Sequence, residues 1–417
     1  MAILFTNLRL LDPEAGALLD DQEVLVDGDR IVQVGPNLEA SDDVERIDLG
    51  GRTLMPGMID SHVHVVSTMV DLWANMIAPS SLTALRAARI MREILERGFT
   101  TVRDLAGADI GLVWAVEEGL IEGPRLVICG RGLSMTGGHG DARRRTDTRP
   151  NTLEGRLGAL TRIADGVDEV RKAVREELKE GANFIKIMAN GGVSSPTDPI
   201  HSLQYSDDEI LAIVEEAENA GTYVAAHVYT DEAIRRVVEL GIRSIEHCNL
   251  IGSETAELAA ESGVTAVPTL VAYEGLALEG ERFGLGEAEI AKIDIVREAG
   301  LDSLRIIRDA GLPMAFGSDL LGELQKYHCM EFEIRAQVLT PAEIIRSATI
   351  VGAELCDMEG EVGVVQPGAY ADLLVVDGDP LSDISLLQGD GKHMDAIMMG
   401  GEFFKREVWG ERSSGPG

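Results

Sequence analysis

The sequence predicts an α/β protein: a (β/α)8 TIM barrel with a small β-sandwich domain that is built from both termini. Apolar runs of strand length alternate with amphipathic helical stretches, and the alternation repeats eight times, which is typical of such a barrel. Strand-like texture at the two ends of the chain predicts the smaller domain. A chain of 417 residues is long enough for both. A doubly wound open sheet is the alternative for the central part.

The two ends of the chain share the texture of short strands and turns. Residues 1–56 contain AILFTNLRLLD, EVLVDGDRIVQVG and RIDLGGRTLMP, and an Asp27-Gly28 pair in the second of these is a hairpin signal. Residues 358–417 return to this texture in GVVQPGAYADLLVVDGDP. We expect the two segments to pair as the halves of one sandwich beside a barrel of residues 57–357.

The central part supplies the repeating units. Its strand candidates are residues 57–65, 99–107, 125–133, 184–192, 223–229, 244–251, 265–273 and 313–321. Between them lie helical stretches such as 81–98, 165–181, 206–221 and 230–241, several opened by Ser, Thr or Asp and closed by Gly. Because a barrel of this kind places its chemistry at the C-terminal ends of the strands, polar residues there are the functional candidates.

Charge and composition restrict the partners. Acidic residues number 71 and basic residues 37, so the net charge is -34, and such a field repels nucleic acid and anionic membranes. The four cysteines form no CxxC pair, which predicts neither a disulfide framework nor a structural zinc site. We find no signal peptide and no run of about 18 apolar residues. We expect a cytoplasmic homo-oligomer that acts on a small molecule.

Two histidines end the first strand candidate. His62 and His64 lie one residue apart, and residues i and i+2 of a strand point to the same side, so the two imidazoles can form a metal-ligand pair. Histidines at such a place can also be solvated or bonded within the core. Four more candidates end or occupy other strands: Lys186, His227, His247 and Asp319. We predict that all six converge on one rim.

Lys186 is unusual in this set because an ammonium cannot bind a metal. Its neighbours are Phe184, Ile185, Ile187 and Met188, and burial of an unpaired ammonium among them is costly. One interpretation is an ion pair with a buried carboxylate. The other is that burial lowers the pKa of the lysine, so that the neutral amine captures carbon dioxide and the carbamate bridges two metal ions.

Six stretches together resemble the amidohydrolase superfamily of binuclear metal hydrolases. They are PGMIDSHVH, FIKIMANGG, AAHVYT, SIEHC, GSDL and PGAYADLLVVDGDP. Within the superfamily the chain is similar to the imidazolonepropionase-like branch, with its prolidase-type dipeptidases and bacterial ochratoxin-hydrolysing amidohydrolases. The resemblance implies one metal on His62, His64, carboxylated Lys186 and Asp319, and another on Lys186, His227 and His247. Nitrogen and oxygen ligands with hydrolytic chemistry favour zinc.

The resemblance implies hydrolysis of the amide bond to a C-terminal hydrophobic or aromatic amino acid, in dipeptides or N-acyl amino acids, with ochratoxin A as a candidate. A hydroxide that bridges the metals would attack the carbonyl. Asp319 would act as general base and acid. Tyr229, two residues after His227, would donate a hydrogen bond to the oxyanion, although a tyrosine at a strand end can also be only a rim residue.

Substrate contacts are predicted in the loops. The stretch SMTGGHGDARRR, residues 134–145, reads as a mobile wall over the rim, and we predict that His139 and Arg143 contact the substrate. His139 would be a catalytic residue beside the substrate carbonyl or carboxylate, and a structural role is its alternative. A solvated surface run is the alternative for the arginines. His328, in the loop after the last strand candidate, is a further predicted substrate contact.

Two other functions remain open. One is hydrolysis of a cyclic amide or imidazolone at the same site. The other is a non-catalytic scaffold, which in related proteins accompanies the loss of metal ligands, and none is missing here. Deamination is disfavoured, because deaminases of this fold typically lack the lysine that stands here as Lys186.

Overall fold

The central part of the chain alternates strands with helices, as predicted. The computed structural model describes residues 2–148, 153–193, 195 and 198–407. Two parallel sheets run through this part, in the orders β6-β7-β8 and β10-β9-β11-β12-β13-β14. Their strands are β6 (Met58–Val63), β7 (Phe99–Asp104), β8 (Arg125–Ile128), β9 (Gly132–Ser134), β10 (Thr161–Ile163), β11 (Ile185–Met188), β12 (Val224–Thr230), β13 (Ser244–Leu250) and β14 (Thr265–Val267).

Three predicted strands differ from the structure. Of residues 265–273, only β14 is a strand, because helix α8 begins at Leu270. Residues 125–133 are split into β8 and β9, which belong to different sheets. Residues 313–321 form no strand beyond an isolated bridge between Met314 and Ala266. The backbone of this segment still bonds to both sheets, since the amide of Ala315 donates to Ala266 and the amide of Asp319 donates to His62, at 2.9 and 2.8 Å. Among the described residues, no continuous strand ladder closes the two sheets into a barrel.

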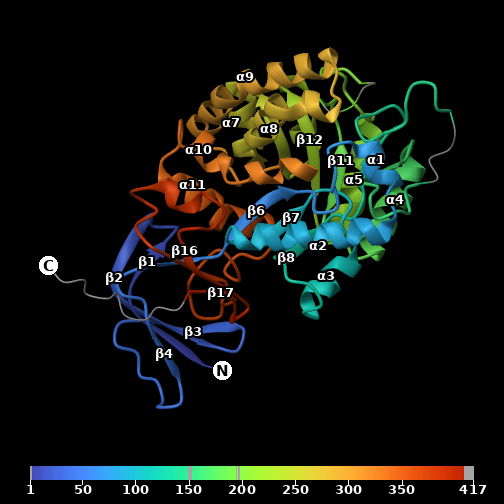
Figure 1. Ribbon diagram of the computed structural model, residues 1–417. Helices are drawn as coiled ribbons and strands as arrows, with labels where there is room; N and C mark the ends of the chain where they lie inside the picture. The colour runs from blue at the N-terminus through green and yellow to red at the C-terminus, as the bar shows by residue number, and fades with distance from the viewer. Residues whose placement is uncertain (1, 149–152, 194, 196–197, 408–417) are drawn as a thin grey trace.

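Helices surround the parallel sheets (Figure 1). Their ends follow the predicted capping signals: the Ser206 and Glu209 side chains form a capping box, and the Thr230 hydroxyl accepts the amide hydrogen of Ala233. The helices are α1 (Leu72–Ile77), α2 (Ser80–Glu96), α3 (Ile110–Glu117), α4 (Val167–Lys179), α5 (Asp207–Asn219), α6 (Asp231–Glu239), α7 (Ser253–Glu261), α8 (Leu270–Glu279), α9 (Glu287–Asp309), α10 (Met330–Arg335), α11 (Pro341–Ser347) and α12 (Ile350–Leu355). Three short 3₁₀ helices are η1 (Gly280–Phe283), η2 (Gly322–Tyr327) and η3 (Ile384–Leu387).

Both ends of the chain contribute to one sheet, which confirms the predicted pairing. Strand β5 is antiparallel to β15, with Met55 opposite Leu374. The predicted hairpin is present, with Asp27 opposite Arg30 and Gly28 at a left-handed φ of 62°. The eight strands are β1 (Ile3–Asp12), β2 (Ala17–Asp27), β3 (Arg30–Gly35), β4 (Glu45–Asp48), β5 (Thr53–Pro56), β15 (Leu373–Val376), β16 (Met394–Met399) and β17 (Glu402–Arg406). The two-sheet form of a sandwich is not confirmed, because these strands all belong to a single sheet.

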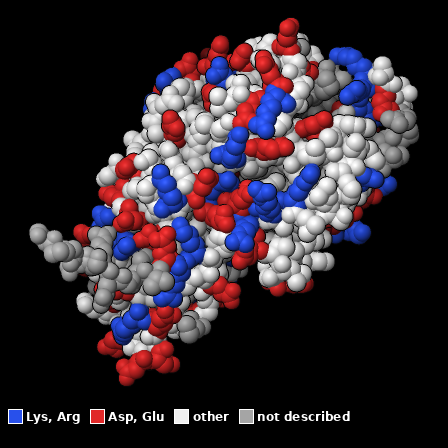
Figure 2. Space-filling view, viewed as in Figure 1, with Lys and Arg blue, Asp and Glu red and all other residues white. Residues whose placement is uncertain are grey.

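The terminal sheet lies at one end of the molecule and α7 to α9 lie at the other (Figure 1). One apolar core continues from the sheet into the parallel part, because buried Met55 and Leu374 belong to the same cluster as Met58 and Phe99. Acidic and basic side chains are interspersed on the face shown in Figure 2. No helix among the described residues has the length and apolar character needed to cross a membrane.

Candidate active site

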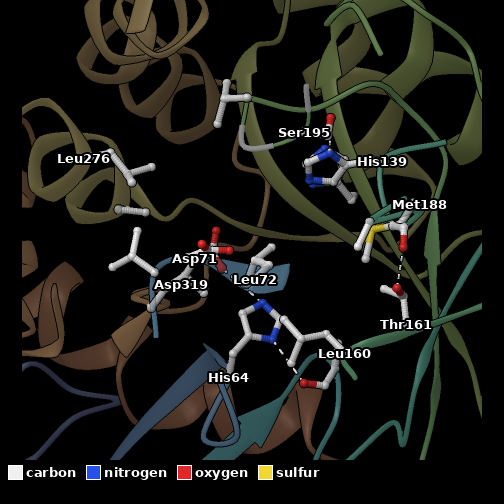
Figure 3. Close-up of a pocket in the computed structure, with 18 of the residues that line it drawn as sticks. His64, Asp71, Leu72, His139, Leu160, Thr161, Met188, Ser195, Leu276 and Asp319 are labelled. Carbon is white, nitrogen blue, oxygen red and sulfur yellow. Dashed lines mark hydrogen bonds and ion pairs between the residues drawn. The ribbon is translucent and has the colours of Figure 1, made fainter. Parts of the chain in front are cut away.

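A cavity of about 340 Å³ opens where the parallel strands end (Figure 3). The six predicted ligands are brought to it by strands β6, β11, β12 and β13 and by residues 313–321, which follow helix α9. All of them line the cavity: His62, His64, Lys186, His227, His247 and Asp319. Convergence on one cavity therefore follows the sequence prediction, and the geometry below tests whether these side chains fit metal ions.

Three of these residues form a compact donor group. The Nε2 atoms of His62 and His64 lie 3.4 and 3.1 Å from Oδ1 of Asp319, and the three ligand atoms lie within 4.8 Å of one another. Asp319 has a left-handed φ of 52°, a strained conformation that its amide hydrogen bond to His62 helps to hold. Burial opposes its ionisation, but His62 and His64 outweigh this effect and lower the pKa of Asp319 well below its usual range. Two imidazoles and a carboxylate suit a divalent cation.

The remaining imidazoles adjoin this group. The ring centroids of His227 and His247 are 4.6 Å apart, and those of His62 and His247 are 4.9 Å apart. Nδ1 of His247 lies 2.8 Å from the Thr269 hydroxyl oxygen, which leaves Nε2 as the available ligand atom. Burial lowers the pKa of both His227 and His247 well below the usual value, so both rings are neutral, as metal binding requires.

Lys186 lies among these rings without a partner. Its side chain is about 1% exposed, and among the described residues its Nζ has no hydrogen-bond acceptor. Burial lowers the pKa of Lys186 to about 8, against the attraction of Glu246 and Asp319. The ion pair that was one interpretation of this lysine is not formed with any described carboxylate. An orphaned, buried amine with a lowered pKa fits a group that reacts to become a ligand.

Sequence reasoning missed Glu246, which orients His62. Its Oε2 lies 2.8 Å from Nδ1 of His62, and its Oε1 accepts hydrogen bonds from Arg103 and from the Ser244 hydroxyl, at 3.2 and 2.6 Å. Burial alone would raise the pKa of Glu246, but Arg103 and His62 hold it well below its usual range. A carboxylate on Nδ1 fixes the tautomer that offers Nε2 to a metal. The signal in the sequence was an acidic residue within an apolar strand.

Asp60 was also missed, and it explains His328. The Asp60 carboxylate accepts hydrogen bonds from the amide of His62 at 3.0 Å and from the Ser318 hydroxyl at 2.6 Å. Nε2 of His328 lies 2.8 Å from Oδ2 of Asp60, and its ring stacks on Phe99 at 4.3 Å. His328 is fully buried and does not line the cavity. The structure therefore corrects the predicted substrate contact, because the His328 ring is buried against Asp60 and Phe99 and does not reach the cavity.

The predicted catalytic residues His139 and Tyr229 line the cavity. The ring of His139 stacks on His227 with centroids 4.3 Å apart, and its Nδ1 lies 3.2 Å from the Ser195 hydroxyl, toward which it points in Figure 3. The Tyr229 hydroxyl oxygen accepts a hydrogen bond from Tyr273 at 3.1 Å. Burial raises the pKa of Tyr229, so its hydroxyl is a hydrogen-bond donor at neutral pH.

The neighbouring arginines of the run 143–145 have different surroundings. Nε and Nη2 of Arg143 lie 2.8 and 2.6 Å from the two oxygens of the Asp141 carboxylate, and Arg143 does not line the cavity. Arg144, the next residue, does line it. The prediction that Arg143 contacts the substrate is therefore corrected: a neighbouring carboxylate, which sequence spacing alone did not assign to it, binds its guanidinium outside the cavity.

Comparisons with known proteins agree with this site. Residues 53–402 match the amidohydrolase family. The crystal structure of an amidohydrolase superposes with a TM-score of 0.95 at 52% identity, over 98% of this chain and 100% of that chain. A prolidase complexed with N-methylphosphonate-L-proline superposes with the same TM-score at 48% identity and the same coverage. Ochratoxinase from Aspergillus niger is 32% identical over 382 residues, which cover 87% of this chain and 78% of that protein.

The family match spans most of the chain, and ochratoxinase and the prolidase fall in the branch that the sequence resembles. The similarity to ochratoxinase and prolidase supports hydrolysis of amide bonds, and in this cavity His62, His64 and Asp319 form a group suited to a metal ion. The chain belongs to the amidohydrolase family and is a hydrolase that acts on amide bonds.

Proposed function

We propose that the protein uses two divalent metal ions to hydrolyse the amide bond to a C-terminal hydrophobic or aromatic amino acid, in dipeptides and N-acyl amino acids. One observation carries the proposal: among the described residues Nζ of Lys186 has no partner, and it is buried in the cavity that also holds the five other predicted ligands, His62, His64, His227, His247 and Asp319. A second ion needs a bridging anion, and a lysine that stays cationic would repel both ions.

Carboxylation of Lys186 resolves this conflict. The neutral amine attacks the carbon of carbon dioxide and loses a proton, and the resulting carbamate is an anion with two oxygens. His62, His64, Lys186 and Asp319 would then hold one ion, and Lys186, His227 and His247 the other. Zinc suits these nitrogen and oxygen ligands. When bound, the ions would lower the pKa of water from 15.7 to about 7 and would polarise the amide carbonyl.

The side chains of this cavity divide the remaining work. Asp319, ionised at neutral pH, accepts a proton from the attacking water and passes it to the departing amine nitrogen. Tyr229 donates its hydroxyl hydrogen to the oxyanion that forms on the carbonyl oxygen. His139, on the opposite wall from His64 in Figure 3, contacts the substrate beside the scissile bond.

The cavity walls suit an apolar substrate with a free carboxylate. Apolar side chains line much of it, among them Trp73, Met76, Leu160 and Phe283. Arg144 lines the same space and its side chain is exposed. An arginine recognises a carboxylate through two parallel hydrogen bonds. Likeness to ochratoxinase makes ochratoxin A a candidate substrate.

The proposal extends to the assembly. The hydrogen bonds of residues 313–319 to β6 and β14 support a closed (β/α)8 arrangement for residues 57–357, with residues 1–56 and 358–417 as a separate unit. We also place the enzyme in the cytoplasm as a homo-oligomer. Opening of a cyclic amide or imidazolone at the same site is the second candidate function. A non-catalytic scaffold is disfavoured because the donor set is intact.

Metal analysis and a substrate screen test the proposal together. We expect about two metal ions per chain, loss of amine release on chelation, and recovery with Zn²⁺. The screen compares N-acyl-phenylalanine and X-Phe dipeptides with cyclic amides of similar size. Hydrolysis of the cyclic compounds alone would favour the second candidate, and purified protein that neither binds metal nor gains activity with it would contradict the proposal.

A further inference from the structure

A line of hydrogen-bonding side chains runs along the cavity wall from His247 to Tyr229. Nδ1 of His247 lies 2.8 Å from the Thr269 hydroxyl, which lies 3.4 Å from the Tyr273 hydroxyl, which in turn donates to Tyr229 at 3.1 Å. All four side chains are buried. Thr269 and Tyr273 stand four residues apart where α8 begins, so their side chains share one face of the helix.

The line has a single direction of donation. Nδ1 of His247 is nearer to the Thr269 hydroxyl than to Oδ2 of Asp319, which is 3.8 Å away, so its hydrogen goes to Thr269. A threonine or neutral tyrosine hydroxyl has one hydrogen to give, and each member that accepts from the residue before it donates to the next. Among the described residues, no acceptor is found for the hydrogen of Tyr229 itself. That hydrogen is left for the cavity.

We propose that Thr269 and Tyr273 are positioning residues that hold Tyr229 as an oriented donor toward the tetrahedral oxygen formed in amide hydrolysis. The inference rests on the proposed function. The hydrogen bond that Tyr229 accepts from Tyr273 restricts rotation of the Tyr229 hydroxyl about its C–O bond. In a line of hydrogen bonds, each donated bond also polarises the next hydroxyl and makes it a stronger donor. The benefit grows as negative charge develops on the substrate oxygen, so it acts on kcat more than on KM.

The test uses metal-loaded enzyme and removes one hydroxyl at a time. Tyr273→Phe and Thr269→Val keep the shape of the side chains and should each lower kcat by about tenfold, with KM within about twofold of the wild type. Affinity for a phosphonamidate analogue of the tetrahedral state should fall by a similar factor in both variants. Metal content should stay unchanged in Tyr273→Phe, whose lost hydroxyl bonds to no proposed metal ligand, so this variant separates the effect on Tyr229 from any effect on the metal site. If Tyr273 acts only through Tyr229, Tyr273→Phe should lower kcat no further once the Tyr229 hydroxyl is removed. The double variant Tyr229→Phe/Tyr273→Phe should therefore be no slower than Tyr229→Phe alone.

Tyr327→Phe is the matched control. Its hydroxyl bonds to Glu279 outside the cavity, so this variant should match the wild type in kcat and in affinity for the analogue. Additive effects in the double variant would show that Tyr273 acts on the substrate by itself and would overturn the inference, as would wild-type kcat in both single variants. If wild-type enzyme cleaves no amide, the proposed function fails, and the analogue affinities still decide the inference: a weaker Tyr273→Phe complex supports it and an equal one overturns it.

Discussion

At Lys186, burial and charge conflict. The ammonium form would lie fully buried without an acceptor, which costs several kcal/mol, and the side chain is as buried as the leucines of the core. Its apolar neighbours in the sequence indicate burial, yet only the folded chain shows that none of the described carboxylates forms an ion pair with it. Glu246 and Asp60 present the opposite case: each is a buried carboxylate whose two oxygens both take part in hydrogen bonds, one of them to the proposed ligand His62.

Substitution of Lys186 tests the carbamate. In Lys186→Ala, metal content and activity should fall together while the protein remains folded, because the side chain lies at the catalytic end of the strands. Acetate or propionate can enter the space and replace the carbamate oxygens, so a short-chain acid with added metal should restore part of the activity. The measurements are metal per chain, amine release and thermal unfolding.

Lys186→Arg is the companion variant, because a guanidinium fills the space and cannot be carboxylated. It should stay inactive with or without added acid. Full metal occupancy and normal activity in this variant would refute the carbamate. If the lysine served only an ion pair, Lys186→Ala would instead destabilise the fold by about 3 to 5 kcal/mol.

In the loop between β9 and β10, two adjacent arginines have different contacts. Arg143 turns to the Asp141 carboxylate, while Arg144 faces the cavity. Burial raises the pKa of Asp141, but the hydrogen bonds from Arg143 outweigh this effect and lower it, so the pair stays charged at neutral pH. The arginine run in the sequence correctly indicated this loop, and the choice between the arginines depended on a side-chain contact.

Comparison of a free acid with its methyl ester tests this assignment. Loss of a charge-assisted contact worth about 1.5 to 3 kcal/mol should lower kcat/KM on the free acid by more than tenfold in Arg144→Ala. The ester, which lacks the anionic carboxylate, should be cleaved by Arg144→Ala and by the wild type at similar rates. Arg143→Ala should keep the wild-type preference for the acid. Equal preference for acid and ester in the wild type would contradict carboxylate recognition at this loop.

At the scale of the molecule, one core joins the terminal sheet to the parallel part. Leu374 on β15 lies opposite Met55 on β5, and both are fully buried in the cluster that includes Met58 and Phe99 on the first two parallel strands. The chain continues from β5 into β6 with only Gly57 between them, so the terminal sheet is packed at the start of the strand that carries His62. The sheet therefore supports the site through packing, without contributing a residue to the cavity lining.

Truncation of Leu374 should affect stability and leave catalysis intact. Leu374→Ala removes buried methyl groups and should cost about 2 to 5 kcal/mol of unfolding free energy. Denaturant unfolding of the metal-loaded protein measures this cost, and kcat/KM of the folded enzyme should remain that of the wild type. Leu19→Ala, at a side chain 39% exposed on β2, is the control and should change stability by no more than about 0.5 kcal/mol. Loss of activity without loss of stability in Leu374→Ala would contradict a purely supporting role.

By itself, the sequence determined the features that arise within short stretches. Capping residues such as Ser206 and Thr230 and the period of the apolar runs are local, so helix and strand positions followed from them. The six ligand candidates could be named for the same reason, since each stands in or next to an apolar run in a recognisable stretch. Residues 125–133, 265–273 and 313–321 were the exceptions. In residues 313–321 the backbone hydrogen bonds go to β6 and β14, which are distant in the chain, so no local pattern shows where they form.

Only the tertiary structure decided which side chains meet. Glu246 bonds to His62 across 184 positions of the chain, Asp60 to His328 across 268, and Tyr273 to Tyr229 across 44. No local pattern encodes such pairs, since each depends on how several strands and helices pack. The absence of a partner at Lys186 is equally a property of the packed interior. The ligand residues can thus be recognised from local motifs, while the contacts that fix their orientation and shift their pKa exist only in the folded chain.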